Sequence, residues 1–157
     1  MKSIIHAARD LEEFLDMRGW KHVIIGGMAL QRWGEARLTK DVDLTLLVGF
    51  GNEEHYIDQL LAHYRPRIDK AREHALAYRV LLLESTDGIP IDMSLGALPY
   101  EERMIERSSV YEFLDGVFLR TCSAEDLIVL KAFANRAQDW IDIRGVLIRQ
   151  QNKLDID

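Results

Sequence analysis

The stretch VIIGGMALQRWGEARLTKDVDLTLLV, residues 23–48, decides the fold of this chain. Two glycines follow a short apolar run, and after thirteen further residues Asp41-Val42-Asp43 opens a second apolar run. Because side chains alternate along a strand, Asp41 and Asp43 point to the same face, with Cα atoms about 6.5–7 Å apart. A carboxylate buried without a partner costs far more than its packing returns. The segment therefore predicts a buried strand whose paired carboxylates meet a partner of opposite charge.

The rest of the chain predicts a mixed sheet between helices. Helical spacing and composition predict helices at about residues 3–18, 28–33, 57–64, 99–107, 124–136 and 138–150. Short apolar runs predict strands at about residues 23–25, 42–48, 78–84, 89–95, 110–113 and 117–120, of which the last four form two antiparallel hairpins. The fold class is therefore α+β (an α/β mixed sheet). We expect a single domain over residues 1–157, with residues 121–157 as a C-terminal helical pair packed on it.

Composition limits the classes of function. The 26 acidic residues against 20 basic ones argue against a general nucleic-acid coat protein, because phosphate binding needs a surplus of Lys and Arg. The one strongly basic stretch, residues 65–72, is expected to be a solvated loop or a docking place for an acidic acceptor such as RNA. The three tryptophans, Trp20, Trp33 and Trp140, are expected to fill the core.

Cysteine usage and hydropathy indicate the compartment. The one cysteine, Cys122, cannot form an internal disulfide, which fits a reducing environment. The N-terminus turns acidic within ten residues, and no apolar stretch is long enough to span a bilayer. We therefore expect a cytoplasmic protein without a membrane partner.

A third aspartate can join the first two. Asp92 projects from one face of its predicted strand, while Ile91 and Met93 share the other. If this strand lies beside the strand of Asp41 and Asp43, three carboxylates converge, which is the ligand set of a two-metal site. A divalent ion would remove the repulsion that otherwise raises one of the pKa values. Such oxygen-rich sites suit Mg²⁺, which usually takes further ligands from substrate phosphates.

The glycines supply the other half of a nucleotide site. Gly26 and Gly27 stand where a predicted strand turns into a helix. Glycines let backbone amides approach a ligand closely, and a helix N-terminus offers unpaired N–H groups to an anion. A triphosphate held there would present its α-phosphate to ions on Asp41 and Asp43. Each feature alone has an ordinary structural explanation, but the order strand, Gly-Gly, helix, Asp-x-Asp, strand, Asp is much less expected by chance.

These residues resemble the signature of the DNA-polymerase-beta-like nucleotidyltransferase superfamily. The fuller stretch is similar to small bacterial nucleotidyltransferases of the AbiEii toxin type, which often show Arg-x-Thr-x-Asp-x-Asp, here Arg37, Thr39, Asp41 and Asp43. The C-terminal stretch SAEDLIVLKAFANRAQDWIDI also resembles theirs, at Asp126, Lys131, Arg136, Asp139 and Asp142. The resemblance spans about residues 20–148 and implies a nucleotidyltransferase-like fold.

The resemblance implies transfer of a nucleoside monophosphate (NMP) from an NTP to a hydroxyl acceptor. Asp41 and Asp43 would bind two metal ions, Mg²⁺ or alternatively Mn²⁺, and Asp92 would complete the site and activate the acceptor. Gly26 and Gly27 would hold the triphosphate through backbone amides alone, although some members place Ser after the first glycine.

Two cations are further nucleotide-binding candidates. Lys131 would neutralise phosphate charge as a point cation, and a solvated helix lysine is an equally good interpretation. Arg37 is a weaker phosphate candidate. Asp139 and Asp142, three residues apart on the last helix, favour a salt-bridge network with Lys131 and Arg136 over a direct role.

Three functions fit this set of residues. The leading one is the toxin of a toxin–antitoxin pair, with a cognate antitoxin, that modifies RNA, in particular tRNA ends, or a protein. The second is an antibiotic-modifying nucleotidyltransferase, because an acidic protein suits a cationic aminoglycoside-like substrate. The third is a catalytically silent nucleotide-binding module, which the presence of all three aspartates argues against.

Overall fold

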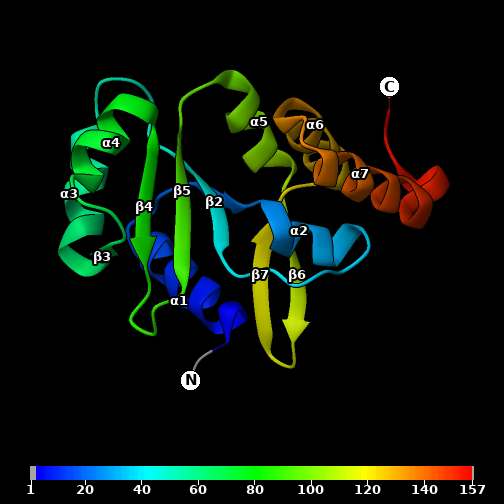
Figure 1. Cartoon of the computed structure of the whole chain (residues 1–157), viewed down its shortest axis with the longest axis horizontal. Helices are drawn as coiled ribbons and strands as arrows, with labels where there is room; N and C mark the ends of the chain where they lie inside the picture. Colours follow the sequence, from blue (N-terminus) through cyan, green and yellow to red (C-terminus); the bar gives the residue numbers. More distant parts are fainter. Residues whose placement is uncertain (1–2, 157) are drawn as a thin grey trace.

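A seven-stranded mixed sheet forms the centre of the computed structural model, which describes residues 3–156 (Figure 1). The strands lie in the order β3-β4-β5-β2-β1-β7-β6. Their bounds are β1 His22–Ile24, β2 Val42–Leu47, β3 Arg65–Pro66, β4 Val80–Glu84, β5 Pro90–Gly96, β6 Ser109–Leu114 and β7 Val117–Thr121. The six predicted strands are present within two residues of their expected ends, and the two-residue edge strand β3 was not predicted.

Helices flank this sheet within residues 3–156. Their bounds are α1 Ile4–Asp16, α2 Gly26–Trp33, α3 Glu53–His63, α4 Ala71–Tyr78, α5 Pro99–Arg107, α6 Ala124–Ala134 and α7 Ala137–Gln150, followed by the 3₁₀ turn η1 Gln151–Lys153. Six of the seven α-helices lie where helical spacing predicts them. The fold is therefore the expected mixed sheet between helices, with a C-terminal helical pair.

Helix α4 is the α-helix that the sequence did not predict within residues 3–156. It begins inside the basic stretch 65–72, which was expected to be a loop. Left-handed residues bound it on both sides, Lys70 with φ 55° and Arg79 with φ 57°, and no side chain caps its N-terminus. Only Ala71 and Ala75 of this helix are buried, so its apolar stripe is too narrow to be recognised in the sequence.

Strand β2 is the centre of the sheet, as its apolar sequence predicts. It pairs antiparallel with β1 and parallel with β5, and the latter pairing sets Asp43 opposite Asp92. Val42, Leu44 and Leu46 point into the core and are fully buried. Because both faces of β2 are covered, its hydrophobic residues form a nearly continuous run, as in other internal strands.

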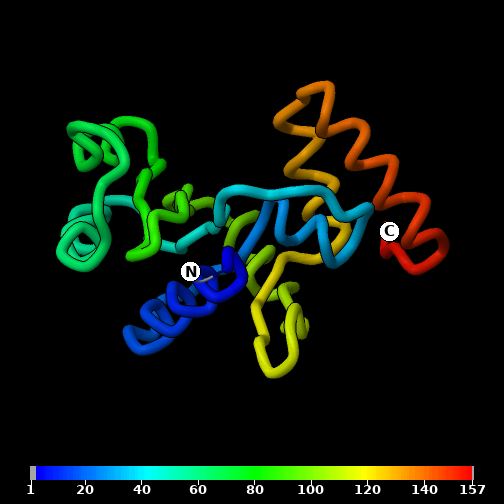
Figure 2. The backbone as a smooth tube through the Cα atoms, turned by 60° about the horizontal axis from the view of Figure 1, so that its bottom comes forward, coloured from blue at the N-terminus to red at the C-terminus, as the bar shows by residue number. Residues whose placement is uncertain are grey.

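Two hydrophobic clusters cover the two faces of the sheet. Helix α1 packs on β2 and β7 and joins the larger cluster, which includes Leu11, Leu15 and Met93. Helix α2 packs on β2, α6 and α7 and joins the second cluster, which includes Leu30 and Leu127. Figures 1 and 2 show α3–α4 and the α6–α7 pair at opposite ends of the molecule, so the helical pair reaches the sheet through α2.

Local signals fix the α6–α7 pair. The Ser123 hydroxyl accepts a hydrogen bond from the Asp126 N–H at 3.1 Å and caps α6. Asn135, with φ 55°, ends α6, and α7 begins two residues later. Trp20 and Trp33 pack against the two clusters. The prediction that Trp140 fills the core is wrong, because Trp140 lies on the outer face of α7 and is 52% exposed.

None of the helices in residues 3–156 combines the length and the apolar character that crossing a membrane requires.

Candidate active site

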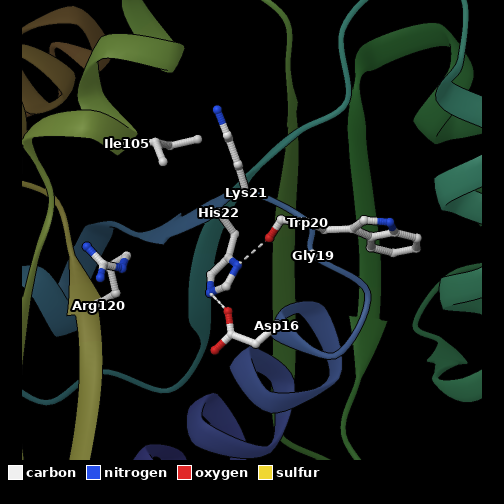
Figure 3. Close-up of a pocket in the computed structure, with 7 residues that line it drawn as sticks. All are labelled: Asp16, Gly19, Trp20, Lys21, His22, Ile105 and Arg120. Carbon is white, nitrogen blue, oxygen red and sulfur yellow. Dashed lines mark hydrogen bonds and ion pairs between the residues drawn. The ribbon is translucent and has the colours of Figure 1, made fainter.

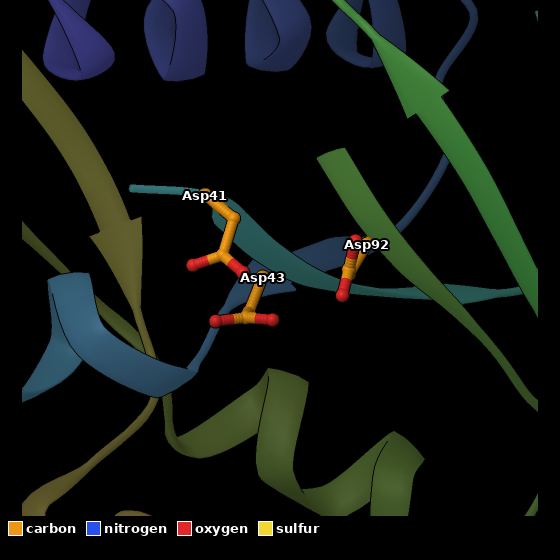
Figure 4. A group of neighbouring side chains, drawn as sticks. All are labelled: Asp41, Asp43 and Asp92. Carbon is orange, nitrogen blue, oxygen red and sulfur yellow. The ribbon is translucent and has the colours of Figure 1, made fainter. Parts of the chain in front are cut away.

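Three aspartates meet on one face of the sheet. Asp41 stands immediately before β2, Asp43 lies within it, and Asp92 is the register partner of Asp43 on β5. One carboxylate oxygen from each lies within 4.8 Å of the others. Figure 4 shows the three side chains directed to a common region from β2 and β5. We call Asp41, Asp43 and Asp92 the aspartate triad.

Asp43 stands beside two further carboxylates of the aspartate triad. Burial raises the pKa of Asp43 to about 6, and the charges of Asp41 and Asp92 act in the same direction. Lys131 and Arg136 act against this rise. A shift of this size corresponds to about 3 kcal/mol, which the burial of Leu44 and Leu46 readily offsets at about 1.5–3 kcal/mol each. The fold therefore tolerates an arrangement of carboxylates that a cation would relieve.

The residues of the aspartate triad fit a hard divalent ion. Three carboxylates supply oxygen ligands only, and Mg²⁺ and Mn²⁺ prefer such donors. Asp41, Asp43 and Asp92 are all half-buried, so the face that they share is open to solvent water and to a substrate, which would supply further ligands. The chemistry of the donors and their accessibility thus agree with a metal site.

Two glycines shape the turn that faces the aspartate triad. Gly26 has φ 64°, and a Cβ atom there would lie 2.8 Å from Cγ of Asp43. A Cβ atom on Gly27 would lie 2.6 Å from Oγ1 of Thr39. The Ile25 N–H donates to the carbonyl of Asp43 at 2.9 Å and ties the turn to β2. Glycine is therefore required at both positions by close contact with the neighbouring strand and loop.

The glycine turn also begins α2. The helix starts at Gly26, two residues earlier than predicted, and no side chain caps it. The first N–H groups of a helix point away from it and favour an anion. The turn consequently places backbone donors next to the carboxylates, which is the arrangement required for a phosphate that bridges the helix and a metal ion.

Five charged side chains form a second cluster, four from the C-terminal segment of α6 and α7 and one, Arg37, from the segment between α2 and β2. Lys131 is buried, and its Nζ donates to Asp142 at 2.7 Å and to Asp139 at 3.3 Å. Arg37 donates to both oxygens of Asp142, at 3.2 and 3.0 Å. Arg136 donates from Nε to Asp139 at 2.7 Å. We call these five residues the charge network; the interpretation of Lys131 as a solvated lysine is wrong.

The charge network is satisfied by its own members. Hydrogen bonds from Arg136 lower the pKa of Asp139 to about 2 against the effect of its burial, and Lys131 adds to this effect. Burial alone would raise the pKa of Asp142, but hydrogen bonds from Arg37, Lys131 and Gln138 lower it. Both carboxylates are ionised at neutral pH, so three cations against two anions leave a net charge of +1 beside the aspartate triad.

One cavity is lined by all the residues predicted from the sequence to act in catalysis, metal binding or nucleotide binding. Its volume is about 470 Å³. It is lined by the aspartate triad, the glycine turn, Arg37 and Lys131, together with Leu38, Thr39, Lys40 and Arg136. A smaller adjoining cavity of about 220 Å³ shares Gly26, Asp43, Lys131 and Arg136 and has apolar walls from Ile25, Leu127, Leu130 and Ala134. Polar and apolar subsites thus lie side by side.

Sequence reasoning missed one partner of the aspartate triad. Arg67, in the stretch expected to be a loop, donates from Nη2 to Oδ1 of Asp92. The sequence offered only the general basic character of residues 65–72 as a signal. The contact depends on the pairing of β3, β4 and β5, which local patterns do not specify.

A separate cavity of about 300 Å³ lies at the far end of β1 (Figure 3). There His22 pairs with Leu46 in the sheet, whereas Gly26 and Asp43 lie beyond the other end of β1. The His22 ring contacts the Trp20 carbonyl at 2.9 Å and Glu12 at 3.3 Å. Burial acts to lower the pKa of His22, but these contacts outweigh burial and raise it. His22 therefore joins α1 to β1 and is a structural residue.

Comparison with known proteins extends the geometric findings. The family described as "Nucleotidyl transferase AbiEii toxin, Type IV TA system" matches residues 19–156. No curated protein matches the chain in sequence.

Solved structures share the fold. An antigenic nucleotidyltransferase-like protein from Paracoccidioides brasiliensis is 15% identical with a TM-score of 0.58, over 92% of this chain and 73% of that one. The lincomycin-bound lincosamide antibiotic adenylyltransferase LnuA is 10% identical with a TM-score of 0.57, over 87% and 92%. The antibiotic-resistance factor ANT(2'')-Ia is 17% identical with a TM-score of 0.58, over 95% and 85%. At these identities the likeness concerns the fold alone.

Proposed function

Because the chain belongs to the AbiEii nucleotidyltransferase toxin family, we propose that it transfers an NMP from an NTP to a hydroxyl group of RNA, in particular tRNA. The observation that carries this proposal is the convergence of the aspartate triad opposite the glycine turn in one cavity. Family membership supports the transferase class. The metal, the nucleotide and the acceptor are parts of the proposal.

Each residue of the site has a chemical task in this reaction. Asp41 and Asp43 would hold two divalent ions, Mg²⁺ or Mn²⁺, and Asp92 would complete the set of ligands. When bound, such ions clamp the attacking and leaving oxygens of a phosphoryl displacement. The acceptor oxygen forms a bond to the α-phosphorus, the bond to the β-phosphate oxygen breaks, and pyrophosphate leaves. Asp92 takes the proton of the acceptor hydroxyl.

The cavity suits an NTP. Amides of Gly26 and Gly27 hold the triphosphate, and the charge network presents its net positive charge to the phosphates through Arg37 and Lys131. The adjoining apolar cavity suits a nucleobase, and ATP is one of the four candidates. Because Lys131 of α6 lines the same cavity as Asp43 of β2, we further propose that residues 121–157 act as part of one nucleotidyltransferase domain.

The mouth of the cavity favours a phosphate-bearing acceptor. Arg37, Lys40 and Arg136 line the cavity and are exposed, although the protein as a whole carries a net charge of −6. A local cationic rim attracts a polyanion and adds a salt-dependent contribution to its binding. We therefore propose RNA as the acceptor, with a cognate antitoxin as the regulatory partner that the family description supports.

A second candidate is transfer of the NMP to a cationic antibiotic. The overall charge of −6 suits such a substrate. Of the solved structures with this fold, one is described as a lincosamide antibiotic adenylyltransferase and another as an antibiotic-resistance factor. Modification of an antibiotic panel without modification of RNA would favour this candidate.

Label transfer tests the proposal directly. The protein is incubated with each α-³²P-labelled NTP, Mg²⁺, and either total tRNA, cell protein or an aminoglycoside and lincosamide panel. We expect label on tRNA with at least one NTP, and loss of that label in Asp92→Asn. Asp87→Asn, a matched change at an exposed turn residue, should retain it. Failure of every combination with folded protein would contradict the proposed function.

A further inference from the structure

Asp92 is held by a residue outside the predicted site. Nη2 of Arg67 donates to Oδ1 of Asp92, and the two side chains are 27% and 34% exposed. Arg67 does not line the cavity that contains the aspartate triad. The guanidinium therefore contacts Asp92 from outside that cavity.

The sheet fixes the base of the Arg67 side chain. The Arg67 N–H donates to the Leu82 carbonyl at 3.0 Å and continues the pairing of β3 with β4. Leu82 is in turn the register partner of Asp92, and Asp92 is that of Asp43. Side chains opposite each other in neighbouring strands point to the same face. Arg67, Asp92 and Asp43 thus belong to one row across the sheet.

The position of Arg67 in this row counteracts the repulsion between Asp92 and the other two carboxylates. The carboxylates of Asp41 and Asp43 repel Asp92, which without a partner would turn away from them into solvent. A charge-assisted hydrogen bond from a guanidinium is strong and directional. Because Arg67 engages Oδ1, the second oxygen of Asp92 can serve as a metal ligand while the first stays bonded.

We propose that Arg67 is a positioning residue that holds Asp92 in the orientation required for divalent ions at the aspartate triad. The inference rests on the proposed function, because it assigns metal ions to this site. Outer hydrogen-bond partners of metal ligands typically change metal affinity by about 10–100-fold. Arg67 therefore tunes the affinity of the site without contact with the substrate.

A purely electrostatic role for Arg67 leads to the opposite expectation. A cation near the site repels Mg²⁺, so its removal would strengthen metal binding if charge were its main contribution. Positioning and repulsion thus differ in the sign of the effect. Arg67→Met removes both the donor and the charge, and the direction of the change in metal affinity decides between them.

Metal binding without substrate provides the test. Mn²⁺ is titrated into the full chain in the absence of NTP and acceptor, and free Mn²⁺ is measured by electron paramagnetic resonance. We expect the Kd of Arg67→Met to rise about 10-fold or more, and Arg67→Lys, which keeps the charge but loses the planar fork, to show a smaller rise. Thermal melting confirms that each variant is folded.

Arg65→Met is the matched control. Arg65 lies two residues before Arg67, on the edge strand β3, pairs with Glu84 and is largely exposed, so its loss changes the net charge equally, farther from Asp92. Its Kd for Mn²⁺ should equal that of the unsubstituted protein. An unchanged or lower Kd in Arg67→Met, or absence of Mn²⁺ binding to the unsubstituted protein, would overturn the inference. Because no NTP is present, this result is independent of whether label transfer is found.

Discussion

The aspartate triad and the charge network both bring carboxylates close together, but the charged groups around those carboxylates differ in sign. In the charge network, Asp139 and Asp142 each bind two cationic side chains, and their pKa values are lowered. In the aspartate triad, Asp43 has two carboxylate neighbours, and its pKa is raised to about 6. The network pairs its carboxylates with cationic side chains of the protein, whereas the triad sets three carboxylates together and pairs Asp92 with Arg67. The two clusters therefore present opposite charges to one cavity, the triad through its carboxylates and the network through Arg37, Lys131 and Arg136.

Removal of Lys131 should have the largest effect on stability. Lys131→Met leaves Asp139 and Asp142 buried with one cationic partner fewer each, which should lower the free energy of unfolding by about 3–5 kcal/mol. Urea denaturation at pH 7.5 measures this change. Lys153→Met, at an exposed position of η1, should be within about 0.5 kcal/mol of the unsubstituted protein. Equal stability of the two variants would remove the distinction between network and triad.

Asp43→Asn should raise the free energy of unfolding, whereas Lys131→Met lowers it. The folded protein raises the pKa of Asp43 from 3.8 to about 6, so ionisation at pH 8 destabilises the fold. In EDTA at pH 8, Asp43→Asn should therefore increase the free energy of unfolding by about 2–3 kcal/mol. The gain should disappear below about pH 4, where this carboxyl group is protonated in both the folded and the unfolded chain.

In the presence of Mg²⁺, the unsubstituted protein should become more stable than Asp43→Asn. Ions that bind only the folded unsubstituted protein stabilise it in proportion to the logarithm of their concentration. Denaturation in EDTA and in 10 mM Mg²⁺ measures the stability of the unsubstituted protein and of Asp43→Asn. Asp87→Asn is the matched control at the β4–β5 turn. A destabilised Asp43→Asn variant in EDTA would show that the triad is balanced by the protein itself.

The smallest effect concerns the pH dependence of the charge network. Because the folded pKa of Asp139 is about 2 rather than 3.8, its ionised form stabilises the protein above pH 4 and loses this effect as the pH falls through 2. Asp139→Asn should thus lose about 2 kcal/mol at pH 7, and the difference should shrink between pH 4 and pH 2. Guanidinium denaturation across this range measures it, and a constant difference would contradict the assigned cause.

Local patterns predicted most of the elements. Short apolar runs predicted β2 and β5, and helical spacing and composition predicted α6. Helix α4 and strand β3 were not predicted, because they bury too little apolar surface to show a hydrophobic period in the sequence. Trp140 was misplaced, since the apolar character of a residue does not reveal which face of α7 finds a partner.

The sequence by itself determined that Asp41 and Asp43 share a face and that glycines stand where β1 turns into α2, because strand alternation and backbone freedom are local properties. Only the tertiary structure decided that β5 lies parallel to β2 and brings Asp92 to Asp43. It alone also buried Lys131 between two carboxylates and set Arg67 against Asp92. Such contacts join residues many positions apart, and their formation depends on the packing of the whole sheet and its helices rather than on any neighbouring residue.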